Sequence, residues 1–125
     1  MIYGPDRLHA DLTAIGFPAE RVTAPDGTPF IVIRNFEVPV GRFAGRVIDL
    51  GLQATPDFPL TIASAIHVRS DPHLYDVSDT MKGKRNITNS ALGPEWRYWS
   101  NNLGWSDPKT ARRLISKVNK VFSDA

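Results

Sequence analysis

The apolar residues near the N-terminus recur at helical spacing. Leu8, Leu12 and Ile15 are four and three residues apart, which predicts a short amphipathic helix. Pro5 is tolerated in a first helical turn, and Gly16 is a typical residue just beyond a helix end. We therefore expect the chain to begin with a helix.

The pattern then changes to that of β-strands. Residues 21–23 and 30–33 flank the turn sequence Pro25-Asp26-Gly27, which predicts a β-hairpin. Over residues 47–53 apolar side chains alternate with polar or small ones, as in a strand with one buried face. A fourth strand is expected over residues 63–68. Connections of this length favour a four-stranded antiparallel meander.

The clearest periodicity lies near the C-terminus. Ser106 or Asp107 is expected to cap a helix that has Pro108 near its first position. Its apolar positions form one narrow stripe: Ala111, Leu114, Ile115, Val118, Val121 and Phe122. The opposite side carries cations: Lys109, Arg112, Arg113, Lys117 and Lys120. We expect this helix to pack on the sheet by its stripe and to expose its cations to solvent.

Residues 71–107 show neither period and are predicted to form a long irregular loop. Long loops in compact domains commonly carry function. This one is rich in tryptophan, tyrosine and arginine, which dominate interface energetics. We expect Trp105 to be buried. The predicted binding residues are Lys84, Arg85, Trp96, Arg97, Tyr98 and Trp99.

Composition limits the class of protein. The chain has 125 residues, of which 42% are hydrophobic and 22% charged, as expected for a single α+β domain over 1–125. It contains no apolar run of membrane-helix length, and its N-terminus lacks the pattern of a signal peptide, so a cytoplasmic location is expected. The net charge of +2 is small, which disfavours nucleic acid as the partner.

Several kinds of chemistry are excluded or disfavoured. The chain has no cysteine, which excludes disulfides, thiolate metal sites and cysteine nucleophiles. Its three histidines do not have metal-site spacing, and no glycine-rich phosphate loop or nucleophile elbow is present. We therefore expect neither a metal nor a cofactor.

Two local motifs and the order of elements resemble the ubiquitin-conjugating (UBC) fold. Phe58-Pro59, before a strand ending in His67-Val68, is similar to that family's aromatic–proline step. The run Trp105-Ser106-Asp107-Pro108 is similar to the step that follows the family's active-site loop. Trp96 to Ser100, together with Trp105, resembles the bacterial branch called prokaryotic UBC-like family E. The resemblance covers residues 17–122.

The resemblance implies a bacterial ubiquitin-like conjugation pathway. Its expected partners are a ubiquitin-like modifier and a ubiquitin-activating-type enzyme, whose genes typically neighbour those of this branch, as does that of a JAB-type metalloprotease. The family's nucleophilic cysteine would fall near residues 96–100, where this chain has none. The family's supporting asparagine has a counterpart only in Asn86 or Asn89. Ser100 and Asn86 are therefore the candidate catalytic residues.

Three functions stay open from sequence. Thioester transfer needs a thiolate, so the favoured function is binding of the modifier or of its activating enzyme, and enzymatic activity is uncertain. The alternative is a carrier that holds the modifier as an oxyester on Ser100 or Ser90, although no base is evident in the sequence beside either serine. The alternative from another class is a small basic interaction domain unrelated to ubiquitin, for which nucleic acid is a candidate partner.

Overall fold

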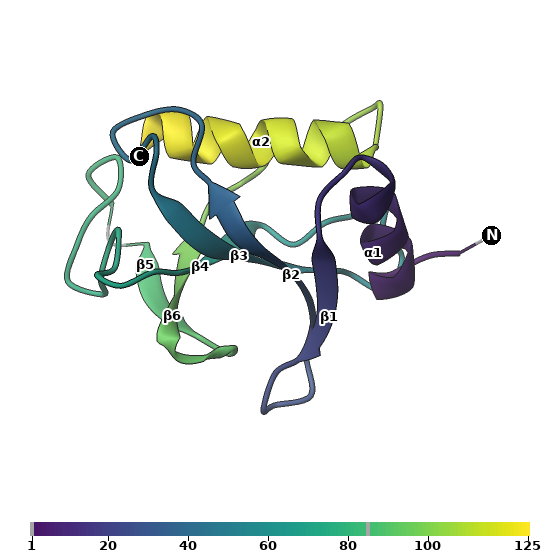
Figure 1. Ribbon diagram of the computed structural model, residues 1–125, viewed down its shortest axis with the longest axis horizontal. Helices are drawn as coiled ribbons and strands as arrows, with labels where there is room; N and C mark the ends of the chain where they lie inside the picture. The colour runs from purple at the N-terminus through teal and green to yellow at the C-terminus, as the bar shows by residue number, and fades with distance from the viewer. Residues whose placement is uncertain (1, 85) are drawn as a thin grey trace.

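The computed structural model describes residues 2–84 and 86–125 (Figure 1). These described residues form two helices and six strands, so the α+β class is confirmed. In chain order the elements are α1 (Pro5–Ala14), β1 (Ala19–Thr23), β2 (Pro29–Glu37), β3 (Val47–Gln53), β4 (Ala65–Arg69), β5 (Ile87–Ser90), β6 (Gly93–Ser100) and α2 (Ala111–Asp124). Within the described residues no helix has the length and apolar character needed to cross a membrane.

The strands form one antiparallel sheet with the order β1-β2-β3-β4-β6-β5. The strands β1 to β4 lie side by side in chain order, but the expected four-stranded meander is not confirmed, because the sheet has two further strands. The segment expected to be a long irregular loop contains the β5–β6 hairpin, and β6 pairs along β4 from Ala65↔Ser100 to Arg69↔Trp96. The prediction of a four-stranded sheet is therefore wrong, because it missed β5 and β6.

The helix α2 lies across one face of the sheet, and α1 lies beside β1 (Figure 1). The apolar stripe of α2 is confirmed, since Leu114, Val118 and Phe122 are fully buried. The predicted cap is wrong, because the helix begins at Ala111 and Thr110 caps it. The Thr110 hydroxyl accepts a hydrogen bond from the backbone N–H of Arg113 at 3.2 Å.

The main core fills the space between α2, α1 and the sheet. Trp99 is the largest side chain in it and makes an edge contact with Phe122, with the ring centroids 5.6 Å apart. Tyr75 packs against the same tryptophan at 5.2 Å, which fastens the segment between β4 and β5 to the core. The tryptophan-rich segment is thus part of the structural framework.

A second, smaller core lies on the opposite face of the curved sheet. It consists of buried Ala24, Phe30, Val32 and Trp96, with Val22 and Leu92 partly buried against them. Gly51 makes this packing possible, because a Cβ there would lie 2.7 Å from Leu92 Cδ1 and 3.2 Å from the Trp96 ring. The β5–β6 hairpin therefore folds back over the sheet at a position where β3 has no side chain.

Candidate functional site

The residues predicted to form one aromatic binding surface lie on a strand, and their side chains alternate between its two faces. Trp96 and Tyr98 stand opposite Arg69 and His67 on the face away from α2. Trp99 points into the main core and is fully buried. Trp96 is also buried, and Tyr98 is half-buried. The predicted residues are brought into one element but not onto one surface.

Arg97 has a structural partner of its own. Its Nε donates to Asp76 Oδ1 at 2.7 Å, and its Nη1 donates to the carbonyl oxygens of Pro94 and Trp96. The guanidinium holds the pKa of the Asp76 carboxyl below its usual value. This pair fastens the segment before β5 to β6. Lys84 lies exposed in a turn, and Arg85 lies outside the described residues.

The two candidate catalytic residues, Asn86 and Ser100, are adjacent in the structure. The Ser100 N–H donates to the Asn86 carbonyl at 3.0 Å, and Asn86 Nδ2 donates to the Ser100 carbonyl at 2.8 Å. The carboxamide of Asn86 therefore binds backbone. The Ser100 hydroxyl is exposed, and within residues 2–84 and 86–125 no base is hydrogen-bonded to it. Their geometry closes the base of the hairpin and contains no activated nucleophile.

Ser90 differs, because a histidine lies beside it. His67 Nδ1 is 2.7 Å from Ser90 Oγ, and the Leu92 N–H donates to the same oxygen at 3.0 Å. The hydroxyl can therefore donate to the imidazole. The expectation that Ser90 has no adjacent base is wrong. Sequence gave no signal for this pair, since 23 residues separate its members and only the pairing of β6 with β4 brings them together.

The environment of His67 makes the imidazole a weak base. The side chain is only 3% exposed, enclosed by Phe30 at 4.7 Å and Tyr98 at 5.2 Å between ring centroids. Burial lowers its pKa from 6.5 to about 4. Its Nε2 is buried and has no hydrogen-bond partner within the described residues. No carboxylate of the described residues is hydrogen-bonded to the ring, so the pair lacks the third member of a catalytic triad there.

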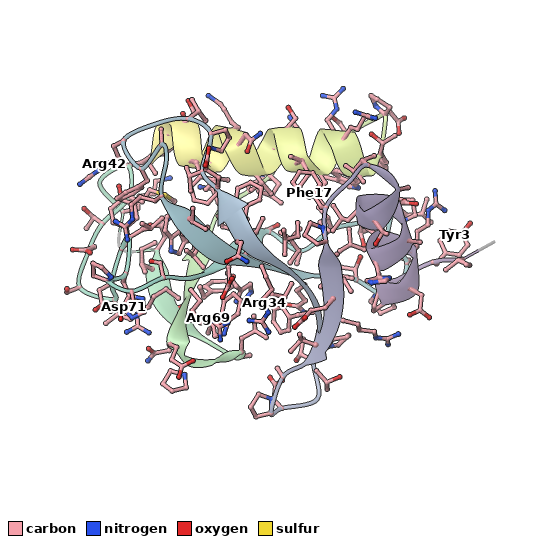
Figure 2. The ribbon with its side chains drawn as sticks, in the orientation of Figure 1. Tyr3, Phe17, Arg34, Arg42, Arg69 and Asp71 are labelled. Carbon is pink, nitrogen blue, oxygen red and sulfur yellow. The ribbon has the colours of Figure 1, made fainter. Side chains whose placement is uncertain are left out.

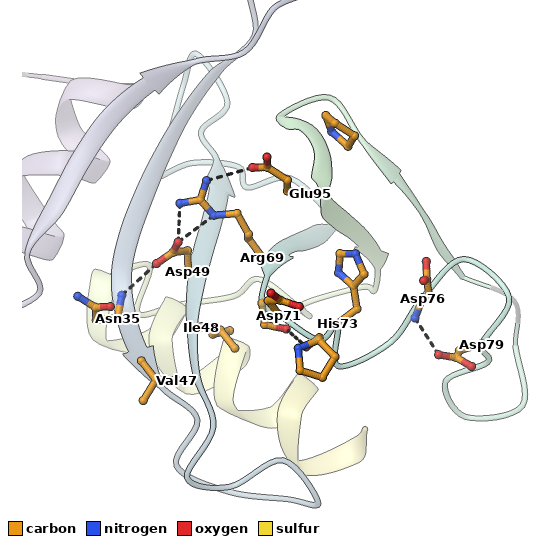
Figure 3. Close-up of a pocket in the computed structure, with 13 residues that line it drawn as sticks. Asn35, Val47, Ile48, Asp49, Arg69, Asp71, His73, Asp76, Asp79 and Glu95 are labelled. Atoms are coloured by element: carbon orange, nitrogen blue, oxygen red, sulfur yellow. Dashed lines mark hydrogen bonds and ion pairs between the residues drawn. The ribbon is translucent and has the colours of Figure 1, made fainter.

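A row of ion pairs crosses the same face of the sheet from strand to strand. Glu20 on β1 pairs with Arg34 on β2 at 2.7 Å, and Arg34 lies 3.5 Å from Asp49 on β3. Asp49 binds Arg69 on β4 at 2.6 Å, and Arg69 reaches Glu95 on β6 at 3.6 Å (Figure 3). Charges that alternate in this way neutralise one another. Figure 2 shows Arg34 and Arg69 side by side on this concave face.

The Asp49 carboxyl stays ionised at the centre of this row. Burial alone would raise its pKa, but hydrogen bonds from Arg69 and from the Asn35 backbone N–H outweigh it and lower the pKa. Asn35 has a positive φ of 55° at a bulge in β2, which turns its N–H toward the carboxylate. The bulge therefore positions a backbone hydrogen-bond donor for the central carboxylate of the ion-pair row.

A cleft of about 900 Å³ opens at the end of the row (Figure 3). Its apolar wall includes Val47 and Ile48, and its rim carries carboxylates that outnumber the single arginine, Arg69. The lining carboxylates are Asp49, Asp71, Asp76, Asp79 and Glu95. Asp76 and Asp79 are joined by a local hydrogen bond, in which the Asp76 N–H donates to Asp79 Oδ2 at 2.8 Å. The cleft has the charge to attract a cationic group.

The described part of the chain holds no group of three or more histidine, aspartate or glutamate side chains that could bind a metal ion. No protein-family model, no curated protein and no solved structure matches this chain.

Proposed function

We propose that this protein is a UBC-like component of a bacterial ubiquitin-like conjugation pathway that acts by binding the modifier or its activating enzyme. The proposal rests on the sequence resemblance described above, and one contact supports it. Trp105 stacks on Phe58 with the ring centroids 6.0 Å apart, and its Nε1 donates to the Pro59 carbonyl at 2.8 Å. The two motifs that carry the resemblance therefore touch, although 46 residues separate them.

The chemistry of the chain supports binding over thioester transfer. The chain has no cysteine, and the Ser100 hydroxyl lies exposed with its neighbour Asn86 bound to backbone. A serine hydroxyl without a base is a poor nucleophile at neutral pH. A UBC-like protein with this site can recognise its partners without carrying the modifier.

The decisive experiment mixes the purified protein with a bacterial ubiquitin-like protein and its activating-type enzyme, the two partners that the resemblance implies. Association is measured by calorimetry, and a parallel reaction with ATP is examined by intact-mass spectrometry. Saturable association without a covalent adduct is the expected result. Absence of association with both proteins contradicts the proposal and favours an interaction domain unrelated to ubiquitin.

One observation favours a second candidate, a carrier that forms an oxyester on serine. The 2.7 Å contact between Ser90 and His67 is the arrangement from which a hydroxyl can lose its proton. The pKa of about 4 works against it, because an imidazole with so low a pKa is a weak proton acceptor at neutral pH. Binding is therefore the favoured function.

The same reaction separates the two candidates. A carrier would give an ATP-dependent adduct, cleaved by hydroxylamine and lost in Ser90→Ala but retained in Ser100→Ala. Loss in Ser100→Ala alone would assign the chemistry to the exposed serine. An adduct of either kind would replace the binding-only proposal.

A further inference from the structure

A groove runs beneath α2, between the last part of β2 and the segment that precedes β1. One part has a volume of about 660 Å³ and the next about 320 Å³, and both are lined by Phe17, Ile115 and Asn119. The first part extends to Glu37 and the second to Arg112. In Figure 2, Phe17 lies directly under α2.

One wall of this groove is an unpaired strand edge. β1 pairs with β2 only from Pro29 to Ile33, so no described strand pairs with the last part of β2 on that side. All five residues 33–37 line the groove. Since successive side chains in a strand point to opposite faces, a wall formed by consecutive residues must include the backbone edge.

The peptide groups of Glu37 point into the groove. The backbone of the next residue, Val38, is hydrogen-bonded on the side of the strand away from the groove. Its N–H donates to the Arg46 carbonyl and its carbonyl accepts from the Gly45 N–H, both at 2.8 Å. Backbone groups of neighbouring strand residues point in opposite directions, so those of Glu37 face away from β3. Such a free edge is a template for a further strand.

The side chains of the groove define what such a strand must carry. Phe17, Phe36 and Ile115 give it an apolar floor. Asn119 Oδ1 is buried beside them and has no hydrogen-bond partner within the described residues. The two ends carry opposite charges, Glu37 at one and Arg112 at the other, and neither forms an ion pair in the described part of the chain.

We propose that this groove binds an extended peptide segment of a partner protein as an additional strand, antiparallel to the free end of β2. The segment has apolar residues at its centre, a cation toward its N-terminal end to meet Glu37, and a carboxylate toward its C-terminal end to meet Arg112. Backbone hydrogen bonds to β2 supply affinity, and the opposite charges set the direction. This proposal does not rest on the proposed function.

The test uses a fluorescein-labelled probe, an acetylated and amidated peptide of sequence Lys-Thr-Val-Val-Val-Ser-Asp. Its control has the same composition with the terminal charges exchanged, Asp-Thr-Val-Val-Val-Ser-Lys. Binding is measured by fluorescence anisotropy and mapped by amide chemical shifts. The first peptide should bind about fivefold more tightly, as expected for two surface ion pairs, and should shift the amides of residues 36–37 and 112–119.

Variants of the protein test each part of the proposal. The double variant Glu37→Lys with Arg112→Glu should reverse the preference between the two peptides, and Ile115→Lys should abolish binding of both. Lys120→Glu changes a charge on the same helix outside the groove and should leave both affinities unchanged. Circular dichroism checks folding, and the double variant keeps the test valid if Ile115→Lys fails to fold.

Three results would overturn the proposal. These are no binding of the first peptide, equal affinity for the two peptides in the unaltered protein, and amide shifts confined to the acidic cleft at residues 71–79. An unchanged preference in the double variant would equally refute the assigned direction.

Discussion

Protonation of one buried histidine should make the stability of this protein strongly dependent on pH. His67 is 3% exposed, and its imidazole is enclosed by Phe30 and Tyr98. Its pKa is lowered from 6.5 to about 4 in the folded protein. The unfolded chain therefore takes up a proton at a higher pH than the folded protein does, and acid favours unfolding.

The size of the effect follows from the two pKa values. Above pH 6.5 neither state binds the proton, and the folded protein keeps its full stability. Between pH 6.5 and about 4 only the unfolded state is protonated, so stability falls by about 1.4 kcal/mol per pH unit. From pH 7.5 to pH 4.5 the loss amounts to about 2.5 kcal/mol, a large share of the stability of a small domain.

Urea denaturation from pH 7.5 to pH 4.5, with the unaltered protein and His67→Gln, measures this loss. Glutamine does not titrate and retains an acceptor for the Ser90 hydroxyl, so the variant should lack most of the dependence. Carboxylates with lowered pKa values, such as Asp49 and Asp76, lose their contribution only below this range. Equal slopes for the two proteins, or an imidazole that titrates near pH 6.5 by NMR, would refute the reasoning.

Two further substitutions test packing. Trp105 is partly buried, not fully buried as expected from sequence. Trp105→Ala should lower the free energy of unfolding by about 2–3 kcal/mol, less than for a fully buried tryptophan, because it removes the stack on Phe58. Urea denaturation measures the change, and an unchanged stability together with loss of partner binding would assign Trp105 to an interface. Gly51→Ala should destabilise the protein by about 1–3 kcal/mol and lower the melting temperature, because the new Cβ would lie 3.2 Å from both His67 Cβ and the buried Trp96 ring, as well as 2.7 Å from Leu92 Cδ1. Ala44→Gly, in an exposed turn, is the control, and equal melting temperatures for the two variants would contradict the packing argument.

Sequence periodicity predicted the elements that have one buried face and one exposed face. The α2 stripe was predicted correctly because Leu114 and Val118 face the main core. The strand β3 was predicted correctly from the alternation that places Ile48, Leu50 and Leu52 in that core, but its other face is not free, because the second core covers Gly51. The same reasoning did not predict that β6 is a strand. It buries Trp96 on one face and Trp99 on the other, so large residues occur at both parities and no period of two is visible.

The candidate site was harder to predict than the fold. Sequence named Asn86 and Ser100 as candidates but did not predict that the β5–β6 hairpin makes them neighbours. It could not place His67 beside Ser90, nor Glu20, Arg34 and Asp49 in one row, since these contacts depend on strand register across the sheet. Register follows from core packing, and a single sequence does not display it.

The residues predicted to bind a partner differ in how accessible their side chains are in the folded protein. A side chain can contribute to recognition only if a partner can reach it, and Trp99 is fully buried while Trp96 is 5% exposed. Truncation of Trp99 would create a cavity in the main core costing about 3–5 kcal/mol, so loss of binding in that variant would report unfolding. Among the described members of the set, Lys84 is exposed and Tyr98 is half-buried without an ion pair, so a recognition test belongs at these two residues and in the groove beneath α2.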